Sequence, residues 1–395
     1  MEVTIHFYIF DFRRGLRVKK WQESIYPIVV IGGLFVAGVS LLVFPEKDFS
    51  ELENRYLTKF PEWTIEKIGS GESQKKLENA ATDQFPFRQD WIKLATGWKK
   101  SLGRTCINGV YLGKQDYYFE QVLDSQISEK QYELNLAILE AFKEQVSGPF
   151  TVMLVPSPGK VLEDYLPEQG VLYEDETWIQ REQEVLGDSS VNIKPLLQAE
   201  AKKGQVYFRT DHHWTLYGAF LGYRSYYEHM GKTYEEYNEF SPQLVRNDFL
   251  GTLYSKVLER KPKKDLFYLV EDIPQSIKVT IDDRETETIY EMDKLKQKDK
   301  YGVYFGGNHG YVKIENQEAT SEDTLLLLKD SFAHSMTPFL MRDYKTILLV
   351  DLRYYNESVF DLLQQYPKAE VLVLYERSNF AKEENLRKLM VAVHR

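Results

Sequence analysis

Thr324-Leu-Leu-Leu-Leu-Lys-Asp-Ser-Phe-Ala333 is the stretch that decides the fold of this 395-residue chain. Its four consecutive leucines form a continuous apolar run, which is typical of a strand buried on both faces of a sheet. Two runs of the same kind follow at Thr346–Val350 and Val371–Tyr375, and helical segments over 333–343 and 357–366 separate the three. This alternation predicts an α/β fold in which helices cover both faces of a parallel sheet.

Earlier segments extend the same pattern. Phe150–Val155 is a fourth apolar run, ended by Pro156, and Val206–Phe208 is a shorter one. Apolar residues recur at helical spacing over 128–144 and 215–230, so we expect a helix at each place. The sequence therefore predicts that the α/β domain begins well before the leucine run.

The region 257–320 has a different pattern. Short stretches of alternating apolar residues lie between charged turns, at Leu266–Val270, Ile277–Ile281 and Thr288–Tyr290. Alternation with period two is typical of half-buried strands in hairpins. We expect a β-rich insertion in the α/β domain.

Near the N-terminus, Ile25–Phe44 contains 20 residues without a charge. At 1.5 Å per residue, such a helix spans the ~30 Å hydrocarbon core of a membrane. Basic residues precede it and acidic residues follow it, which favours a cytoplasmic N-terminus. A cleaved signal peptide and a buried helix are the alternatives. We expect a single-pass protein in the cell membrane, with the bulk of the chain extracytoplasmic.

These patterns divide the chain into four parts. We expect a basic cytoplasmic tail over 1–24 and a transmembrane helix over 25–44. A stalk follows over 45–113, with helical periodicity in residues 72–102. The α/β domain occupies 114–395.

The composition restricts the possible partners. Hydrophobic residues make up 43% of the chain and aromatic residues 14%, which is enough for a large core. The formal net charge is −10, so we expect no nucleic-acid partner. The only cysteine is Cys106, which excludes an internal disulfide framework and a thiolate-cluster metal site. A phosphate-binding glycine loop and a metalloprotease helix motif are both absent from the sequence, and we expect no cofactor.

Polar residues gather where two predicted strands end and helices begin. Arg209-Thr-Asp-His-His-Trp214 follows Val206–Phe208, and Lys329-Asp-Ser-Phe-Ala333 follows the four leucines. Ligands of open parallel sheets bind at the carboxyl ends of the strands. We therefore expect both clusters at one edge of the sheet.

Ser331 has the position that a serine nucleophile needs. A sharp strand-to-helix turn exposes its hydroxyl, and the N–H groups that open the next helix can stabilise an oxyanion. Serine also needs a base, usually a histidine oriented by a carboxylate. Asp211 and His213 supply both, and their i, i+2 spacing in a loop lets the carboxylate hold the imidazole.

Other interpretations of these residues remain open. Asp330 and Ser331 are typical helix-capping residues. Asp211, His212 and His213 are also compatible with a solvated loop or with part of a metal site, although adjacent histidines point apart. His334, close to Ser331 in sequence, is the rival base. Asn308, in Gly306-Gly-Asn-His-Gly310, is typical of a turn and is a candidate amide donor to an oxyanion.

At these residues the chain resembles the DHHW family of bacterial envelope proteins. Phe208-Arg-Thr-Asp-His-His-Trp-Thr215 contains the signature that names the family. The resemblance extends over most of the chain, through Glu53–Arg55, Asp83–Arg88, Asn108–Gly113, Phe249–Lys256, Lys329–Phe332 and Asp351–Tyr355.

The DHHW pattern is in turn similar to the SGNH-hydrolase-like domains of the alginate O-acetyltransferases AlgX and AlgJ. This resemblance implies a flavodoxin-like sheet with circularly permuted SGNH order. It matches Asp211 and His213 to an Asp-x-His pair, Trp214 to the tryptophan after it and Ser331 to the nucleophile. Lys329 stands where SGNH enzymes have glycine. The resemblance also implies a partner, a membrane-bound O-acyltransferase that delivers the acyl group.

The working hypothesis is an extracytoplasmic serine O-acyltransferase or esterase that acts on a cell-envelope polysaccharide. Ser331 carries the acyl group, His213 takes its proton and Asp211 orients the imidazole. Asn308, Trp214, His212 and Asp330 are candidate substrate or oxyanion residues, and we expect no metal. The alternatives are a non-catalytic protein that binds glycan or a membrane partner, and a metal hydrolase using Asp211, His212 and His213.

Overall fold

The computed structural model describes residues 20–53, 55–61 and 72–390. It divides into two compact units, one with the N-terminal helix and the segment 55–90, the other with the chain from Trp91 onward. Most of the basic tail expected over 1–24, and part of the stalk, lie outside the described residues.

The first unit contains one long apolar helix. Helix α1 (Lys20–Val43) includes the span Ile25–Val43, none of which is buried. Strands β1 (Phe49–Ser50) and β2 (Arg55–Tyr56) pair antiparallel, and α3 (Glu72–Asp83) follows. The guanidinium of Arg55 donates to both carboxylate oxygens of Asp83, at 3.0 and 2.5 Å. Two segments of the family resemblance thus meet in this unit.

The helical periodicity over 72–102 corresponds to two helices. After α3, the chain turns at Pro86 and Phe87, and α4 (Arg88–Ser101) begins. Proline has no N–H and disfavours the helical conformation of the residue before it, so the helix cannot continue. Phe87 has a φ of 55°, in the left-handed region.

The centre of the second unit is a seven-stranded sheet with the order β10-β9-β11-β13-β12-β14-β6. Four neighbouring strands run parallel, as predicted: β13 (Thr346–Val350), β12 (Thr324–Lys329), β14 (Glu370–Glu376) and β6 (Phe150–Val155). The leucine run forms β12, which lies between two parallel neighbours and is buried on both faces. The predicted α/β fold is confirmed.

The other three strands make the sheet mixed, although its centre is parallel. Strands β9 (Ile277–Ile281), β10 (Arg284–Thr286) and β11 (Tyr311–Asn316) extend the sheet antiparallel beside β13. They come from the region 257–320, which is thus partly built into the sheet. Thr288–Tyr290 is not a strand, because only Tyr290 pairs, in an isolated bridge with Tyr304. Strands β7 (Pro242–Phe249) and β8 (Asp265–Val270) form a separate pair.

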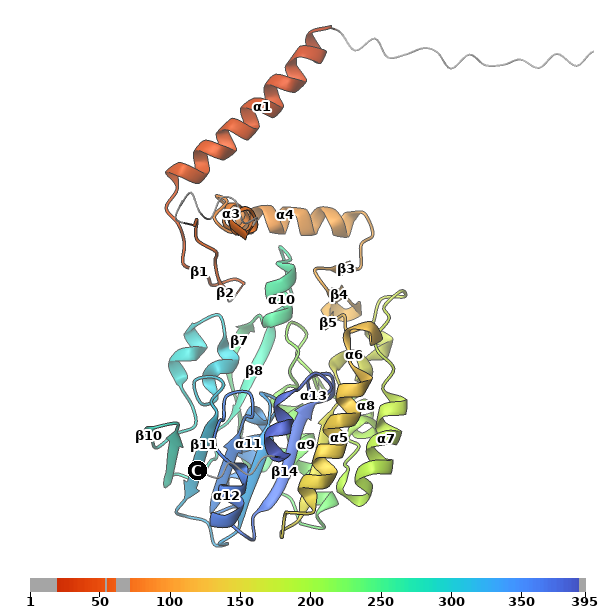
Figure 1. The fold of residues 1–395 in the computed structure, drawn as a ribbon, viewed down its shortest axis with the longest axis vertical. Coiled ribbons are helices and arrows are strands. Elements are labelled where there is room, and N and C mark those ends of the chain that lie inside the picture. Colours follow the sequence, from red (N-terminus) through yellow and green to blue (C-terminus); the bar gives the residue numbers. More distant parts are fainter. Residues whose placement is uncertain (1–19, 54, 62–71, 391–395) are drawn as a thin grey trace, which may run out of the picture. The chain divides into compact units, whose positions relative to one another are not determined.

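Alternate residues of the central strands face opposite sides. Leu325 and Leu327 lie in one core with α9 (Leu216–His229) and α11 (Ala333–Leu340). Leu326 and Leu328 lie in a second core with α5 (Glu129–Lys143) and α12 (Val359–Gln365). Figure 1 shows these helices beside the sheet. The other elements of this unit are β3 (Cys106–Ile107), β4 (Val110–Leu112), β5 (Tyr118–Glu120), α6 (Pro158–Val161), α7 (Glu176–Leu186), α8 (Lys194–Glu200), α10 (Thr252–Val257) and α13 (Arg377–Phe380).

Val206–Phe208 was expected to be a strand of the sheet, and this was wrong. Tyr207 pairs only with Trp214, in an isolated antiparallel bridge, and the N–H of Phe208 donates to the carbonyl of His213. Val206–Phe208 therefore pairs with His213 and Trp214, at the end of the loop that follows it. The polar loop does not end a neighbouring strand. It lies beside Ser331 because α9, which follows the loop, packs against α11, which follows Ser331.

Candidate active site

Ser331 lies in the turn between β12 and α11, with its side chain half-buried. Its hydroxyl lies 2.8 Å from Nε2 of His213. The histidine belongs to the loop before α9, 118 positions earlier in the chain. The structure therefore brings together the two groups that the sequence offered as nucleophile and base.

Asp211 completes a hydrogen-bonded chain through His213. Nδ1 of His213 donates to Oδ1 of Asp211 at 2.6 Å, and the backbone N–H of His213 donates to the same oxygen at 3.0 Å. With a hydrogen on Nδ1, Nε2 carries the lone pair and accepts the Ser331 hydroxyl. This is the geometry of a serine nucleophile with a base and an orienting carboxylate.

The carboxylate of Asp211 stays ionised although it is 1% exposed. Burial by itself raises its pKa, but the imidazoles of His212 and His213 and the hydrogen bonds to His213 and Thr252 outweigh burial and hold the pKa well below its ordinary value. An ionised Asp211 favours the Nδ1–H tautomer of His213 and stabilises an imidazolium when Nε2 takes up a proton.

The other oxygen of Asp211 is held by residues that the catalytic interpretation of the sequence missed. Oδ2 accepts hydrogen bonds from the backbone N–H and the hydroxyl of Thr252, at 2.7 and 3.0 Å. A Cβ added at Gly251 would lie 2.2 Å from this oxygen, so a side chain there would displace the carboxylate. Both residues belong to Phe249–Lys256, a segment that carried the family resemblance.

Tyr301 contacts both the base and the nucleophile. Its ring stacks on the imidazole of His213, with centroids 3.8 Å apart. Its hydroxyl donates to the carbonyl oxygen of Ser331 at 3.0 Å and lies 3.1 Å from Oγ of Ser335. No local pattern in the sequence marked this tyrosine, which is one of 27.

His212 has a defined tautomer as well. Its Nδ1 lies 2.7 Å from the hydroxyl oxygen of Thr252, which already donates its only hydrogen to Asp211. Nδ1 of His212 must therefore donate, which leaves the lone pair on Nε2. Burial and the neighbouring His213 lower the pKa of His212 below its ordinary value. At neutral pH this half-buried ring is a neutral hydrogen-bond acceptor.

Asp330 and Trp214, which were candidate substrate residues, are both buried. The carboxylate of Asp330 accepts hydrogen bonds from the N–H groups of Phe332 and Glu376 and from Nδ2 of Asn379, all within 3.0 Å. The indole of Trp214 donates to the carbonyl of Phe332 and to Ser335, both at 2.9 Å. These contacts hold the Ser331 turn in place and leave neither side chain open to a substrate.

Asn308, the other candidate, is exposed in the loop before β11. Among the described residues, no hydrogen bond joins it to Ser331 or His213. The structure suggests a different amide, that of Asn379, which follows β14 beside β12. Nδ2 of Asn379 has a second hydrogen besides the one it donates to Asp330. In the described part of the chain the Ser331 N–H has no acceptor, so these two donors are candidates for an oxyanion site.

Lys329 is buried at the end of β12, where SGNH enzymes have glycine. Its Nζ donates to Nε2 of His334 at 2.8 Å and lies 3.4 Å from Oδ2 of Asp351. Arg353 makes a bidentate pair with the same carboxylate, at 2.8 and 2.6 Å. Nε2 of His334 is therefore engaged by Lys329, and His213, not its rival His334, is the histidine bound to Ser331.

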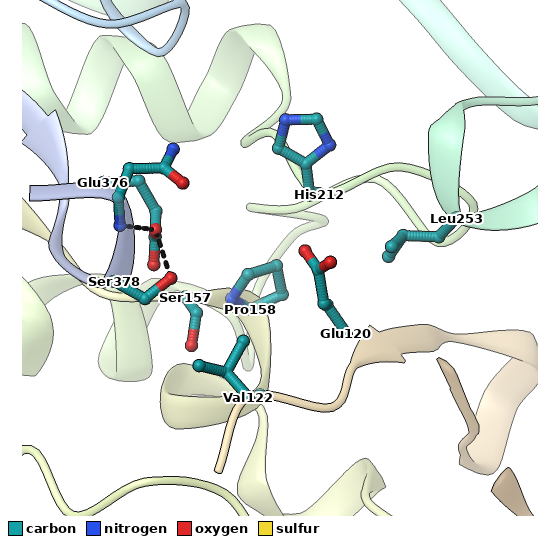
Figure 2. A pocket seen from close by; sticks show the side chains of 10 residues that line it. Glu120, Val122, Ser157, Pro158, His212, Leu253, Glu376 and Ser378 are labelled. Carbon is teal, nitrogen blue, oxygen red and sulfur yellow. Dashed lines mark hydrogen bonds between the residues drawn. The ribbon is translucent and has the colours of Figure 1, made fainter. Parts of the chain in front are cut away.

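A small cleft that opens to solvent lies next to His212. Figure 2 shows His212 and Glu120 on its walls, with Glu376 and Ser378 on one side and Leu253 on the other. Glu376 is 5% exposed, and burial raises its pKa to about 7. The carboxylate of Glu120 and the Nε2 lone pair of His212 supply hydrogen-bond acceptors to this wall.

Asp211, His212 and His213 also offer ligand atoms within 4.8 Å of one another, as a metal site would. Within the described residues, several of these atoms already take part in hydrogen bonds. Oδ1 of Asp211 accepts from Nδ1 of His213, and Nδ1 of His212 donates to Thr252. A metal would have to displace this network.

Comparisons with known proteins place the fold in a wider class. A family model described as the SGNH hydrolase-like domain of the acetyltransferase AlgX matches residues 110–260, and the DHHW protein model matches residues 189–350. The domain is thus SGNH-hydrolase-like and related to AlgX. The resemblance drawn from the sequence is confirmed, and the chain is a DHHW family protein. No curated protein matches it.

Solved structures agree on the fold. A DHHW family protein from Eubacterium siraeum is 22% identical with a TM-score of 0.60, covering 72% of this chain and 96% of that one. Bacillus cereus PatB1 with a sulfonyl adduct is 22% identical with a TM-score of 0.56, covering 70% and 99%. PatB1 without the adduct is 21% identical with a TM-score of 0.57, covering 69% and 97%.

Proposed function

We propose that this protein is a membrane-anchored, extracytoplasmic serine O-acyltransferase or esterase that acts on a cell-envelope polysaccharide. The observation that carries the proposal is the hydrogen-bonded chain from Asp211 through His213 to Ser331. The relation to the acetyltransferase AlgX favours acetyl as the acyl group.

The first half-reaction forms an acyl-enzyme. Oγ of Ser331 attacks the carbonyl carbon of an acyl donor while Nε2 of His213 takes the hydroxyl proton. In this proposal, the N–H of Ser331 and the amide of Asn379 stabilise the oxyanion. When the tetrahedral intermediate collapses, the leaving group takes the proton from His213 and the acyl group remains on Ser331.

In the second half-reaction a hydroxyl group attacks the acyl-enzyme. His213 takes the proton of that hydroxyl, the new ester forms, and Oγ of Ser331 regains a proton from the imidazolium. In a transferase the attacking group is a sugar hydroxyl, and in an esterase it is water. The acceptor-rich cleft beside His212 suits a ligand with several O–H donors and so favours a carbohydrate.

Helix α1 supports the proposed location. Its exposed apolar span fits a membrane anchor, and a signal peptide is the alternative. With the anchor in the membrane and the charge bias described above, the domain faces the exterior. The acyl group must then cross the membrane, which calls for a membrane-bound O-acyltransferase as partner.

The test uses the full-length protein with an activated acetyl ester, and intact mass reports a covalent acetyl group. We expect a single acetyl group on the wild type and on a Ser321→Ala control, and none on Ser331→Ala. A sulfonyl fluoride should block the labelling. Equal labelling of Ser331→Ala, or an unlabelled wild type that binds glycan, would overturn the enzymatic proposal in favour of a binding protein. Adding envelope oligosaccharides then separates transfer from hydrolysis.

A further inference from the structure

Helix α4 carries its apolar residues on the outside. Trp91, Leu94 and Trp98, and Leu102 just after the helix, are spaced three or four residues apart and so share one face. Their exposed fractions are 55%, 55%, 67% and 65%. These four residues are called the α4 stripe below.

The stripe does not belong to a loosely attached helix. On the opposite face, Thr96 is buried, and its hydroxyl donates to the carbonyl of Val257 in α10 at 2.7 Å. Ile92 packs against the apolar cluster that includes Leu253 and Val257. Helix α4 is therefore docked on the α/β domain by one face and presents the stripe with the other.

The charge of this segment is opposite to that of the whole protein. The chain has a formal net charge of −10, yet residues 88–104 contain five basic side chains and one acidic one. The basic residues are Arg88, Lys93, Lys99, Lys100 and Arg104, and the acidic one is Asp90. Arg88 is paired with Asp83 and Lys100 with Glu259, so the excess positive charge comes from the other three. A cationic surface in an anionic protein is complementary to an anionic ligand surface.

An exposed row of two tryptophans and two leucines with flanking basic residues is the pattern of a helix that lies in a membrane interface. Tryptophan prefers the headgroup region, and basic residues near an anionic leaflet are attracted to it. Isolated exposed apolar residues are common on soluble proteins, but a contiguous stripe of this kind marks an interaction site.

We propose that α4 lies on the surface of an anionic lipid membrane, with the α4 stripe inserted among the headgroups. This inference rests on the membrane location in the proposed function. It adds a second contact with the bilayer, made by the α/β domain itself.

The contact would place the candidate active site close to the membrane. Helix α4 packs on α10, and α10 begins at Thr252, whose N–H and hydroxyl bind Asp211. Helix α10 has six residues and is thus about 9 Å long at 1.5 Å per residue. A membrane-bound acyl donor could then reach Ser331 without a long excursion of the domain.

Depth-dependent fluorescence quenching tests the proposal. In a Cys106→Ser background, single cysteines replace Leu94 or Trp98 in the stripe, Leu34 in α1 and Leu134 in α5, which is 50% exposed. The full-length variants carry an environment-sensitive label in vesicles of equal parts phosphatidylglycerol and phosphatidylcholine. A lipid quencher is attached either near the headgroup or near the end of the acyl chain.

We expect the labels at Leu94→Cys and Trp98→Cys to be quenched most by the shallow quencher, and the Leu134→Cys label to be unaffected. Lys99→Glu with Arg104→Glu should reduce quenching at Trp98→Cys. If the Leu34→Cys label is quenched but the stripe labels are not, the inference about α4 is overturned. The membrane anchor then stands, and the stripe is better explained by a protein partner. If only the stripe labels are quenched, the anchor is wrong and the α4 contact holds. Quenching of neither overturns both.

Discussion

Tyr301 lies parallel to the imidazole of His213, with an angle of 9° between the two planes, and its hydroxyl donates to the carbonyl oxygen of Ser331. One buried side chain therefore sets the tilt of the base and the position of the nucleophile. Neither contact is local, because Tyr301 is 30 residues from Ser331 in the sequence.

Tyr301→Phe should keep the stack and lose the hydrogen bonds of the hydroxyl. A buried hydrogen bond contributes about 1 kcal/mol, so acetylation of Ser331 should slow about fivefold. Tyr301→Ala should slow it further, because the imidazole loses its support. Stopped-flow release of the leaving group measures the rate, and Tyr56→Phe, at a ring that is 81% exposed, is the matched control. An unchanged rate in Tyr301→Phe would exclude a positioning role for the hydroxyl.

Asp211→Asn should be far more damaging than Tyr301→Phe. The amide cannot stabilise an imidazolium and favours the wrong tautomer of His213, and the loss in comparable triads is about 10⁴-fold. Single-turnover acetylation checks this, with the exposed Asp361→Asn as control. Retention of more than about a tenth of the rate would mean that Asp211 is not the orienting carboxylate.

Lys329→Met should destabilise the fold. The ammonium of Lys329 bridges His334 and Asp351 in a buried site, and removal of one partner from such a site costs about 3 kcal/mol. Urea denaturation measures the free energy of unfolding. As a control, Lys296→Met removes a solvent-exposed ion pair with Asp293. This variant should change the free energy of unfolding by less than about 0.5 kcal/mol. Similar values for the two variants would contradict a structural role for the buried lysine.

Glu376 should make stability depend on pH. Burial raises its pKa from 4.5 to about 7, so between these values the folded state keeps a proton that the unfolded chain has released. Stability contributed by the protonated form is fully present below pH 4.5 and is lost as the pH rises through about 7, in total about 3 kcal/mol.

Glu376→Gln removes this ionisation, while its carbonyl oxygen can still accept from Ser378 and Asn379. Compared with the wild type, the variant should gain relative stability as the pH rises from 4.5 to about 7, and thermal unfolding across this range measures the difference. A difference that does not vary with pH would show that Glu376 is ionised throughout.

The sequence predicted well those elements that are defined by local patterns. The leucine runs are β12, β13 and β14, and the helices between them begin and end within a few residues of their predicted positions. Continuous apolar runs can only be buried strands or helices, so the pattern limits the choice. Val206–Phe208 was misassigned because three residues carry no such pattern and pair with their own loop.

The partners of the triad could not be predicted in the same way. Gly251 and Thr252 contact Asp211 from 40 and 41 positions away, and Asn379 reaches Asp330 across 49. Such contacts depend on how loops after different strands meet at the sheet edge. A short motif can nominate residues, but it says nothing of the groups that orient them.

By itself the sequence determined the α/β class and the apolar N-terminal span, and it identified Asp211, His213 and Ser331 as candidate catalytic residues. Periodicity and residue chemistry are local properties, so they can be recognised in the sequence alone. Only the tertiary structure decided that the three side chains form one hydrogen-bonded chain, that Trp214 and Asp330 are buried supports, and that α4 exposes its apolar face. Burial and hydrogen bonding are relations between segments far apart in the chain, so they exist only once the sheet and its helices have packed.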